Sequence, residues 1–403
     1  MVEPRLPRRT LSEFPEPPLI STFQKIEDLV KILFLTRALN VGGAERQLVA
    51  LALGLLKRGH EVAVAVFYPD GVLEGELKEA GIPILSLAKR GRWDVVGFLL
   101  RLIHMVRSYR PDVLHSYISN LVTVVVQPFL TSTKIVWGVR SSYMDFSRYD
   151  WLFRVSYGLA CRLSHSADLI IANSHAGRRD HVADGYPEKK MVVIPNGIDT
   201  DRFRPNQEAR VRIRAEWGVT EDEELVGLVG RLDPMKDHET FLEAAFALSQ
   251  SRQSVRFVCV GDGHPDYRAM LQDRARSMGL GDRILWAGTR TDVVDVYSAL
   301  DTLVSCSSGE GFSNVIAEAM ACGIPCVVTD VGDSRLVIGS LGELIPPKDS
   351  SALARGIQRL LDHRMASAEV RKRIVDRFSL EALILKTERE LLDLFLRPGK
   401  NSL

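Results

Sequence analysis

The sequence predicts an α/β protein made of two doubly wound parallel sheets, arranged in tandem and facing each other across a cleft. Three observations indicate this fold. The chain has 403 residues, 46% of them hydrophobic, which is enough for two cores, since domains usually hold about 100–200 residues. Short, unbroken apolar runs alternate with stretches of helical spacing, which is typical of parallel strands covered by helices on both faces. The alternation occurs as two successive series.

The first series spans residues 31–200, the expected N-terminal domain. Its first strand, KILFLT from Lys31, leads through Gly42 and Gly43 into ERQLVALALGLLKRG, where apolar residues recur at helical spacing. Six further β-rich runs follow: EVAVAVF, IPILSL, DVLHSY, KIVWGV, ADLIIANS and MVVIPN. Residues 1–30 lack the apolar core of a secretory signal and are expected to form a loose extension. The apolar run 121–130 is too short for a membrane span.

The second series spans residues 218–375, after a polar linker at 201–217. Its strands are predicted at ELVGLVGR, VRFVCVGDG, RILWAG, TLVSCS and PCVVTD. Residues 376–403 belong to a charged amphipathic helix, which we expect to cross back onto the N-terminal domain. The cleft between the domains is the expected ligand site, because the carboxyl ends of parallel strands and the N-termini of helices face it.

Charge and cysteine content narrow the class of protein. The formal net charge of +1 argues against a dedicated nucleic-acid binder. Residues 1–200 carry 25 Lys and Arg against 20 Asp and Glu, a weak indication of an anionic partner or membrane surface, although such an excess is more often a solvated face. The five cysteines form no CxxC pair and lie mostly in apolar runs, which favours reduced thiols in the cytoplasm.

The stretch GEGFSNVIAEAMACGIPCV places Glu310 and Glu318 eight positions apart at a strand-to-helix junction. Ser313 is a suitable N-cap, and the free N–H groups of a helix N-terminus are suited to a pyrophosphate. Buried carboxylates need hydrogen-bond donors, which the hydroxyl groups of a sugar and a ribose supply. The segment therefore fits a nucleotide sugar. The alternative is an ordinary capped helix with solvated glutamates.

Other candidates follow predicted strands on both sides of the cleft. In GRLDPMK, Arg231 and Lys236 could neutralise a diphosphate leaving group, or they could be surface residues of a loop. Gly42 and Gly43 allow a phosphate or sugar to approach the backbone, although Gly-Gly is also a common turn. His115 ends the run DVLHSY, where it could bond a hydroxyl or phosphate or be a core residue.

The triplet Asp199-Thr200-Asp201 resembles a metal-binding DxD. It lies in PNGIDTDRF, where aspartates support turns, so we predict a turn and no metal site. No His/Cys cluster has the spacing of a zinc site.

In this order, GGAE, His115, PNGID, the GR…K pair, GDG and E-x7-E resemble the retaining glycosyltransferases of family 4, which have the GT-B fold. The resemblance covers residues 31–360. It implies transfer of a sugar from a nucleoside diphosphate donor with retention at the anomeric carbon, and with neither a metal nor a cofactor, the nucleotide sugar being a co-substrate. The resemblance implies that Glu310 binds the donor sugar and that Glu318 binds the ribose. It implies that the diphosphate is bound by Arg231 and Lys236, together with the amides of Phe312, Ser313 and Asn314. Gly43 would approach the donor or the acceptor from the other lobe.

Many relatives carry His-x-His where this chain has His115 and Tyr117, so which of the two faces the reacting centre stays open. Arg140, at the end of KIVWGV, is a candidate for binding an acceptor phosphate. The basic run KRGRW at 89–93 could contact a lipid headgroup or an anionic membrane, or be a plain exposed loop.

The sequence thus predicts a cytoplasmic, hexosyltransferase-type enzyme of surface polysaccharide, lipopolysaccharide or glycolipid synthesis. Its acceptor would be a glycan or a lipid-linked molecule, and it could associate with the cytoplasmic face of the membrane. Two alternatives stay open: a nucleotide-sugar epimerase on the same fold, and a non-catalytic module that binds nucleotide sugars.

Overall fold

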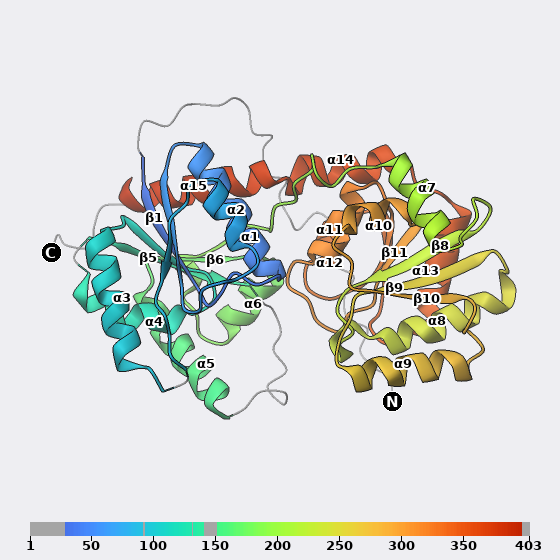
Figure 1. Ribbon diagram of the computed structural model, residues 1–403, viewed down its shortest axis with the longest axis horizontal. Coiled ribbons are helices and arrows are strands. Elements are labelled where there is room, and N and C mark those ends of the chain that lie inside the picture. Colours follow the sequence, from blue (N-terminus) through green and yellow to red (C-terminus); the bar gives the residue numbers. More distant parts are fainter. Residues whose placement is uncertain (1–28, 92, 131, 141–150, 397–403) are drawn as a thin grey trace, which may run out of the picture.

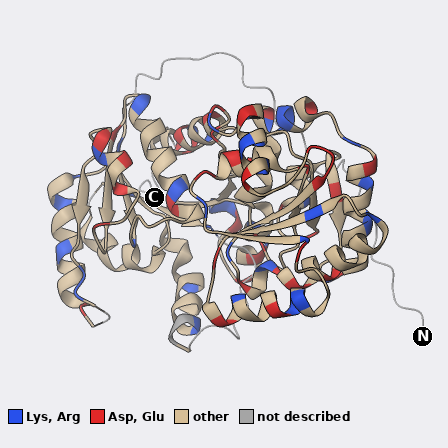
Figure 2. Ribbon diagram, turned by 45° about the vertical axis from the view of Figure 1, so that its right-hand side comes forward, with Lys and Arg blue, Asp and Glu red and all other residues tan. Residues whose placement is uncertain are grey.

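A computed structural model describes residues 29–91, 93–130, 132–140 and 151–396, which form two lobes lying side by side (Figure 1). Both lobes contain an all-parallel sheet with helices on its two faces. Acidic and basic residues are interspersed over both lobes (Figure 2). The predicted pair of doubly wound domains is confirmed.

The first lobe has seven strands in the order β3-β2-β1-β4-β5-β6-β7. The strands are β1 Lys31–Thr36, β2 Glu61–Val66, β3 Ile84–Ser86, β4 Val113–Ser116, β5 Lys134–Val139, β6 Leu169–Ala172 and β7 Met191–Val193. The helices are α1 Gly43–Lys57, α2 Glu74–Glu79, α3 Val96–Tyr109, α4 Asn120–Val126, α5 Trp151–Leu163 and α6 His175–Ala183, with short 3-10 turns η2 Gln127–Phe129, η4 Ser164–Ser166 and η5 Glu188–Lys190. The strand order reverses between β1 and β4, so the ends of these two strands open a crevice.

The second lobe has six strands in the order β10-β9-β8-β11-β12-β13. The strands are β8 Glu224–Val229, β9 Val255–Val260, β10 Ile284–Gly288, β11 Thr302–Ser305, β12 Cys326–Thr329 and β13 Gly342–Ile345. The helical segments are α7 Gln207–Glu216, η6 Pro234–Lys236, α8 His238–Ser251, α9 Pro265–Ser277, α10 Val293–Ala299, α11 Asn314–Ala321, α12 Ser334–Ile338, α13 Ser350–Asp362, α14 Ser367–Phe378 and α15 Leu380–Leu396. Here the order reverses between β8 and β11, which places a second crevice beside Lys236 and Glu310.

The apolar runs of the sequence are buried on both faces of each sheet. In β1, Ile32 and Phe34 belong to one core cluster, and Leu33 and Leu35 belong to the cluster on the opposite face. Because successive side chains of a strand point to opposite faces, a strand covered on both sides needs apolar residues at every position. All five cysteines are free thiols buried in this interior.

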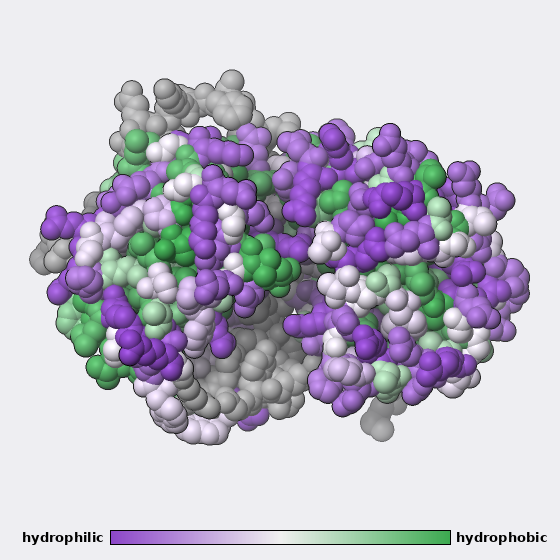
Figure 3. Space-filling model, in the orientation of Figure 1, coloured by the Kyte–Doolittle hydropathy of each residue, from purple (hydrophilic) through white to green (hydrophobic). Residues whose placement is uncertain are grey.

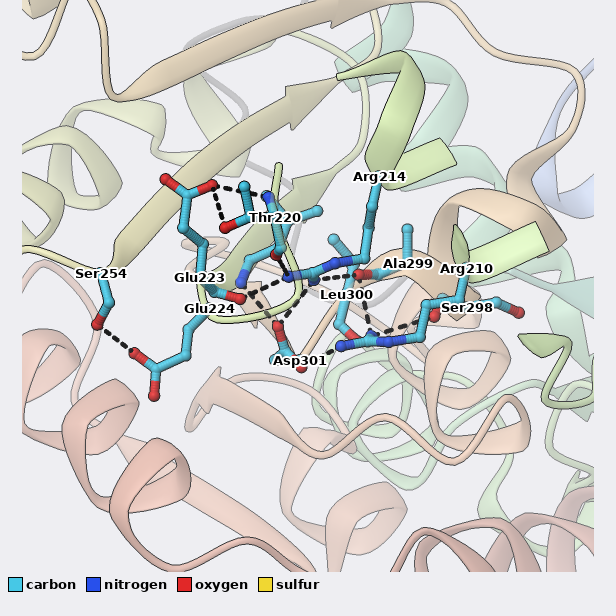
Figure 4. A network of polar contacts seen from close by, with 11 residues as sticks. Arg210, Arg214, Thr220, Glu223, Glu224, Ser254, Ser298, Ala299, Leu300 and Asp301 are labelled. Carbon is cyan, nitrogen blue, oxygen red and sulfur yellow. Dashed lines mark hydrogen bonds and ion pairs between the residues drawn. The ribbon is translucent and has the colours of Figure 1, made fainter. Parts of the chain in front are cut away.

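The predicted linker at 201–217 contains a helix, α7, which packs on the second lobe. Arg210 and Arg214 of α7 form ion pairs with Asp301, with N–O distances of 2.7 and 3.1 Å (Figure 4). Arg210 also donates to the carbonyl oxygens of Ala299 and Leu300, at 3.1 and 3.0 Å. The polar character of α7 made it look like a linker, whereas these arginines fix it to the end of α10.

The C-terminal segment crosses between the lobes as predicted, but it forms two helices that meet at Ser379. α14 lies along the second lobe and α15 along the first, beside α1 (Figure 1). On α15 the buried carboxylate of Glu388 accepts hydrogen bonds from Arg58 Nε at 2.7 Å and from the His60 ring at 2.8 Å. Three leucines of α15, Leu383, Leu391 and Leu394, join the core of the first lobe.

The two chain crossings between the lobes run next to each other. Ile198, on the first crossing, donates its N–H to the Phe378 carbonyl and accepts a hydrogen bond from the Leu380 N–H, both at 2.8 Å. Among the helices described, none combines the length and the apolar character needed to cross a lipid bilayer.

Candidate functional site

A cavity of about 220 Å³ lies between the two lobes, at the carboxyl ends of both sheets. From the first lobe it is lined by Gly43, Ala44, Arg140, Asn173 and Asn196, and from the second by Lys236, Glu310, Phe312, Ser313, Asn314 and Val315. Seven predicted site residues are therefore brought together here: Gly43, Arg140, Lys236, Glu310, Phe312, Ser313 and Asn314. Five others do not line the cavity, namely Gly42, His115, Tyr117, Arg231 and Glu318.

Lys236 and Glu310 form an ion pair on the wall that the second lobe contributes. Lys236 ends η6, a short turn that begins where the Asp233 carboxylate accepts the N–H of Met235 at 2.9 Å. Glu310 lies in the loop between β11 and α11, and the Ser307 hydroxyl donates to its carboxylate at 2.9 Å. The two charged groups are largely buried, which strengthens their mutual attraction.

The N-terminus of α11 faces the same cavity. Ser313 occupies the N-cap as predicted, and its hydroxyl accepts no capping hydrogen bond. The first N–H groups of the helix are thus left without the side-chain acceptor that the sequence suggested. Asn314 instead connects the lobes, because its side-chain oxygen accepts from Asn196 Nδ2 at 2.8 Å.

Gly43, the first residue of α1, lies opposite α11. A Cβ atom on Gly43 would stand 3.3 Å from Asn314 Nδ2, closer than most real Cβ contacts. The glycine therefore allows the two lobes to approach each other at the cavity. Gly42 is the N-cap of α1 with an extended backbone.

Glu318 lies one turn further along α11 and is half-buried. Its carboxylate accepts the Tyr297 hydroxyl at 2.8 Å. Burial raises the pKa of Glu318, and this is opposed by the Tyr297 hydrogen bond and by the charges of Arg46 and Arg202. Arg46 belongs to α1 of the first lobe, so the electrostatic environment of Glu318 includes both lobes.

The predicted clamp of Arg231 and Lys236 is not assembled in this structure. Arg231 follows β8 by two positions, as expected, but its side chain is 69% exposed. Its guanidinium lies 3.4 Å from the carboxylate of Asp233. Of the two predicted cations, Lys236 alone lines the cavity.

His115 and Tyr117 are both fully buried, and neither lines the cavity. Their rings lie 5.5 Å apart, and both ring nitrogens of His115 and the Tyr117 hydroxyl have no hydrogen-bond partner within the described residues. Burial, followed by the charge of Arg140, holds the pKa of His115 well below its usual range, so its ring is neutral. Arg140 covers Tyr117, with the guanidinium carbon 3.8 Å from the ring centre, and it is Arg140 that reaches the cavity.

Sequence reasoning missed the amides of the first-lobe wall, Asn173 and Asn196. Asn173 directly follows β6, and Asn196 lies three positions beyond β7. This position is the one signal that the sequence offers, and asparagines that only form turns share it. It also missed Asp333, which caps α6 across the cleft. The Asp333 carboxylate accepts the backbone N–H groups of His175 at 2.7 Å and Ala176 at 3.0 Å.

The DxD-like triplet forms a turn, as predicted. The Asp199 carboxylate accepts the backbone N–H groups of Asp201 at 3.1 Å and Arg202 at 3.0 Å. The described residues contain no group of three or more His, Cys, Asp or Glu side chains arranged to hold a metal ion. In the basic run 89–93, Trp93 is 89% exposed, while residue 92 lies outside the described residues.

Two family models match the chain, one in each lobe. Residues 41–202 match "Glycosyltransferase Family 4", and residues 223–363 match "Glycosyl transferases group 1". The lipopolysaccharide core biosynthesis mannosyltransferase LpsB of Rhizobium meliloti is 33% identical over 225 residues, which are 53% of this chain and 62% of that protein. N-acetyl-alpha-D-glucosaminyl L-malate synthase of Bacillus anthracis is 28% identical over 58% of this chain and 62% of its own length. The chain thus spans about three fifths of these curated relatives.

Solved structures share the arrangement of the two lobes. Anabaena Alr3699/HepE in complex with UDP-glucose has a TM-score of 0.79 at 24% identity, covering 90% of this chain and 100% of that chain. A glycosyltransferase from Rickettsia africae ESF-5 also has a TM-score of 0.79, at 20% identity, covering 93% of this chain and 100% of that chain. The GT-B fold expected from the sequence is confirmed.

Proposed function

The chain belongs to glycosyltransferase family 4, and we propose that it transfers a sugar from a nucleoside diphosphate sugar to a hydroxyl group of an acceptor. One observation carries the proposal: a single cavity between the lobes is bordered by the Lys236–Glu310 pair and by the N-terminus of α11. A nucleotide sugar requires three kinds of group. Its diphosphate requires a positive charge and free backbone N–H groups, and its hydroxyl groups require a carboxylate that accepts their hydrogen bonds.

In this proposal the diphosphate lies against the N-terminus of α11 and Lys236. The negative charge on its bridging oxygen grows as the bond to the anomeric carbon breaks, so these groups stabilise the transition state more than the ground state. Glu310 accepts hydrogen bonds from the donor sugar and Glu318 from the ribose. The exposed Arg231 would swing toward the diphosphate when donor binds.

We further propose transfer with retention and without a metal ion, as the family resemblance implies. The acceptor oxygen attacks the anomeric carbon on the face from which the diphosphate departs. The new C–O bond forms as the bond to phosphate oxygen breaks, and the acceptor proton passes to the departing phosphate. The acceptor would be a glycan or lipid-linked molecule of surface polysaccharide, lipopolysaccharide or glycolipid synthesis.

The first-lobe surface supports a proposed contact with an anionic membrane. Hydrophobic side chains lie exposed among polar ones there (Figure 3), and those of Val95, Val96 and Leu100 stand on or next to α3, close to Trp93 in sequence. Such a surface, with arginines around it, suits an enzyme whose acceptor is embedded in lipid.

The test is incubation of the full chain with UDP-, GDP- and ADP-sugars, with and without a lipid and glycan extract as acceptor source. We expect nucleoside diphosphate to be released only with the acceptor present, and the sugar to keep its anomeric configuration in the product. Isomerised donor would instead indicate an epimerase. Donor binding without turnover across the panel would indicate a non-catalytic module, and either result would overturn the proposal.

A further inference from the structure

Among the described residues, two cations line the cavity, and only Lys236 has an anionic partner there. Lys236 is paired with Glu310. Arg140, on the opposite wall, makes no ion pair within the described residues, and its Nε and Nη1 atoms are buried without a hydrogen-bond partner there. An unpaired guanidinium is costly to bury, because its lost hydration is not replaced.

The position of Arg140 is fixed by its surroundings. The residue follows the last position of β5, and its guanidinium lies over the ring of Tyr117, with 3.8 Å between guanidinium carbon and ring centre. The cation–π contact holds the group at the cavity without consuming the in-plane N–H donors. Burial lowers the pKa of Arg140, but a guanidinium stays charged at neutral pH.

The neighbouring groups on the same wall are acceptors. The side-chain oxygens of Asn173 and Asn196 are buried and also lack partners within the described residues. A fixed cation flanked by two amide acceptors is complementary to a molecule that carries an anionic group next to hydroxyl groups.

We propose that Arg140 binds an anionic group, a phosphate or a carboxylate, on the acceptor, with Asn173 and Asn196 accepting hydrogen bonds from hydroxyl groups beside it. The acceptor is thus an acidic sugar or polyol derivative. This inference rests on the proposed function, in which the donor diphosphate occupies the opposite wall, at Lys236 and the N-terminus of α11. Tyr117 acts as a positioning residue beneath the guanidinium.

The experiment measures two affinities on the full chain. The first is the dissociation constant of the nucleoside diphosphate that the protein binds, by calorimetry. The second is the affinity for glycerol 3-phosphate, glycerate and uncharged glycerol, by ligand-observed NMR with the nucleotide site saturated. The variants are Arg140→Met, Arg140→Lys and, as matched control, Arg162→Met, an exposed arginine of α5 in the same lobe.

With wild type and with the control, we expect an anionic probe to bind and glycerol not to. Arg140→Met should weaken binding of the anionic probe at least tenfold, while the dissociation constant of the nucleoside diphosphate changes less than twofold. Arg140→Lys should retain part of the affinity for the probe. A phosphate preference over glycerate, or the reverse, identifies which anion the acceptor carries.

Two results would overturn the inference. If Arg140→Met weakens binding of the nucleoside diphosphate as strongly as binding of the probe, the guanidinium binds the donor diphosphate. If neither anionic probe binds wild type, or both bind Arg140→Met unchanged, the site is not an anion site. Failure of the proposed function looks different, because wild type would then bind no nucleoside diphosphate, or would bind the donor without transferring its sugar.

Discussion

The residues around the cavity fall into two groups, those whose charge is already balanced and those whose polar atoms are unpaired. Lys236 and Glu310 balance each other, whereas Arg140 and the amide oxygens of Asn173 and Asn196 have no partner within the described residues. In the proposed function, the wall from the second lobe is organised before a ligand binds, and we expect the wall from the first lobe to gain its hydrogen bonds from the acceptor.

Replacing Glu310 by Gln tests the role of the Lys236–Glu310 ion pair. The substitution keeps the shape but removes the negative charge paired with Lys236, so we expect transfer to fall by about 100-fold or more. The melting temperature should change by no more than a few degrees. Product formation and thermal unfolding are the measurements, with Glu369→Gln, an exposed residue of α14, as control. Unchanged turnover in the folded Gln variant would remove Glu310 from the site.

A pH dependence of stability is predicted at His238, the first residue of α8, which is completely buried. Burial and the charge of Lys236 lower its pKa to about 4. An unfolded histidine protonates near pH 6.5, so between pH 6.5 and pH 4 the unfolded chain binds the proton and the folded chain does not. Stability from this group is therefore complete above pH 6.5 and is lost as the pH falls toward 4.

The measurement is urea unfolding at pH 7 and pH 5. Between these values the wild type should lose about 2 kcal/mol more than His238→Leu, according to the linkage relation. His264→Leu, whose histidine side chain is 75% exposed, should follow the wild type. Equal losses in the wild type and in His238→Leu would show that His238 titrates normally.

A motif predicts where a residue lies along the backbone, but it does not predict the direction in which the side chain points. Lys236 and Glu310 lie 74 positions apart, yet both follow strands that meet at the switch point of the second sheet. Arg231 was placed correctly along the chain, but its side chain points to solvent and to Asp233. Nothing in the sequence distinguishes Asn173 and Asn196 from the asparagines that commonly end strands and form turns.

At the scale of the elements, each predicted strand is present, and the central strands of both sheets have apolar runs buried on both faces. β13, GELI, was missed because it is a short edge strand with a charged residue at its second position.

The GDG motif has a structural explanation in addition to any functional one. A Cβ on Gly261, whose φ is +136°, would stand 2.0 Å from the carbonyl oxygen of Gly230. The motif thus permits the loops after β8 and β9 to touch.

The contact between α6 and the second lobe should set how far the lobes open. Asp333→Ala removes the carboxylate that accepts two N–H groups at the N-terminus of α6, and with it a charge favoured by the helix dipole. We expect the variant to be more open in solution, with a larger radius of gyration by small-angle X-ray scattering.

Asp330→Ala is the matched control for that measurement. Asp330 is an exposed aspartate nearby in the sequence, and its ion pair is with Arg335 of the same lobe. Its loss should leave the scattering curve unchanged. Identical curves for all three proteins would show that the Asp333 contact does not hold the lobes together.

At the scale of the whole molecule, two domains and a cleft were predictable from the repeated alternation of strand and helix patterns. The assignment of α7 to the second lobe was not, since it depends on contacts of Arg210 and Arg214 with residues about 90 positions away. The path of the C-terminal segment was expected, and its division at Ser379 was not.

Membrane contact is a prediction about one face of the first lobe. The full chain should sediment with vesicles that contain anionic lipid and not with purely zwitterionic ones, and added salt should weaken binding. Trp93→Ser combined with Leu100→Ser should reduce the bound fraction severalfold, because both side chains are exposed. Phe246→Ser, a partly exposed residue of the second lobe, should leave it unchanged. Equal binding to anionic and zwitterionic vesicles would contradict an electrostatic contact.

The paired crossings at Ile198 and Ser379 have a mechanical consequence. A single connecting strand would let the lobes twist, slide and separate freely. Two connections on opposite sides of the interface would prevent the lobes from moving relative to each other. Two neighbouring segments bonded to each other restrain twisting and sliding more than bending, so we expect the lobes to move mainly by a hinge at Ile198 and Ser379.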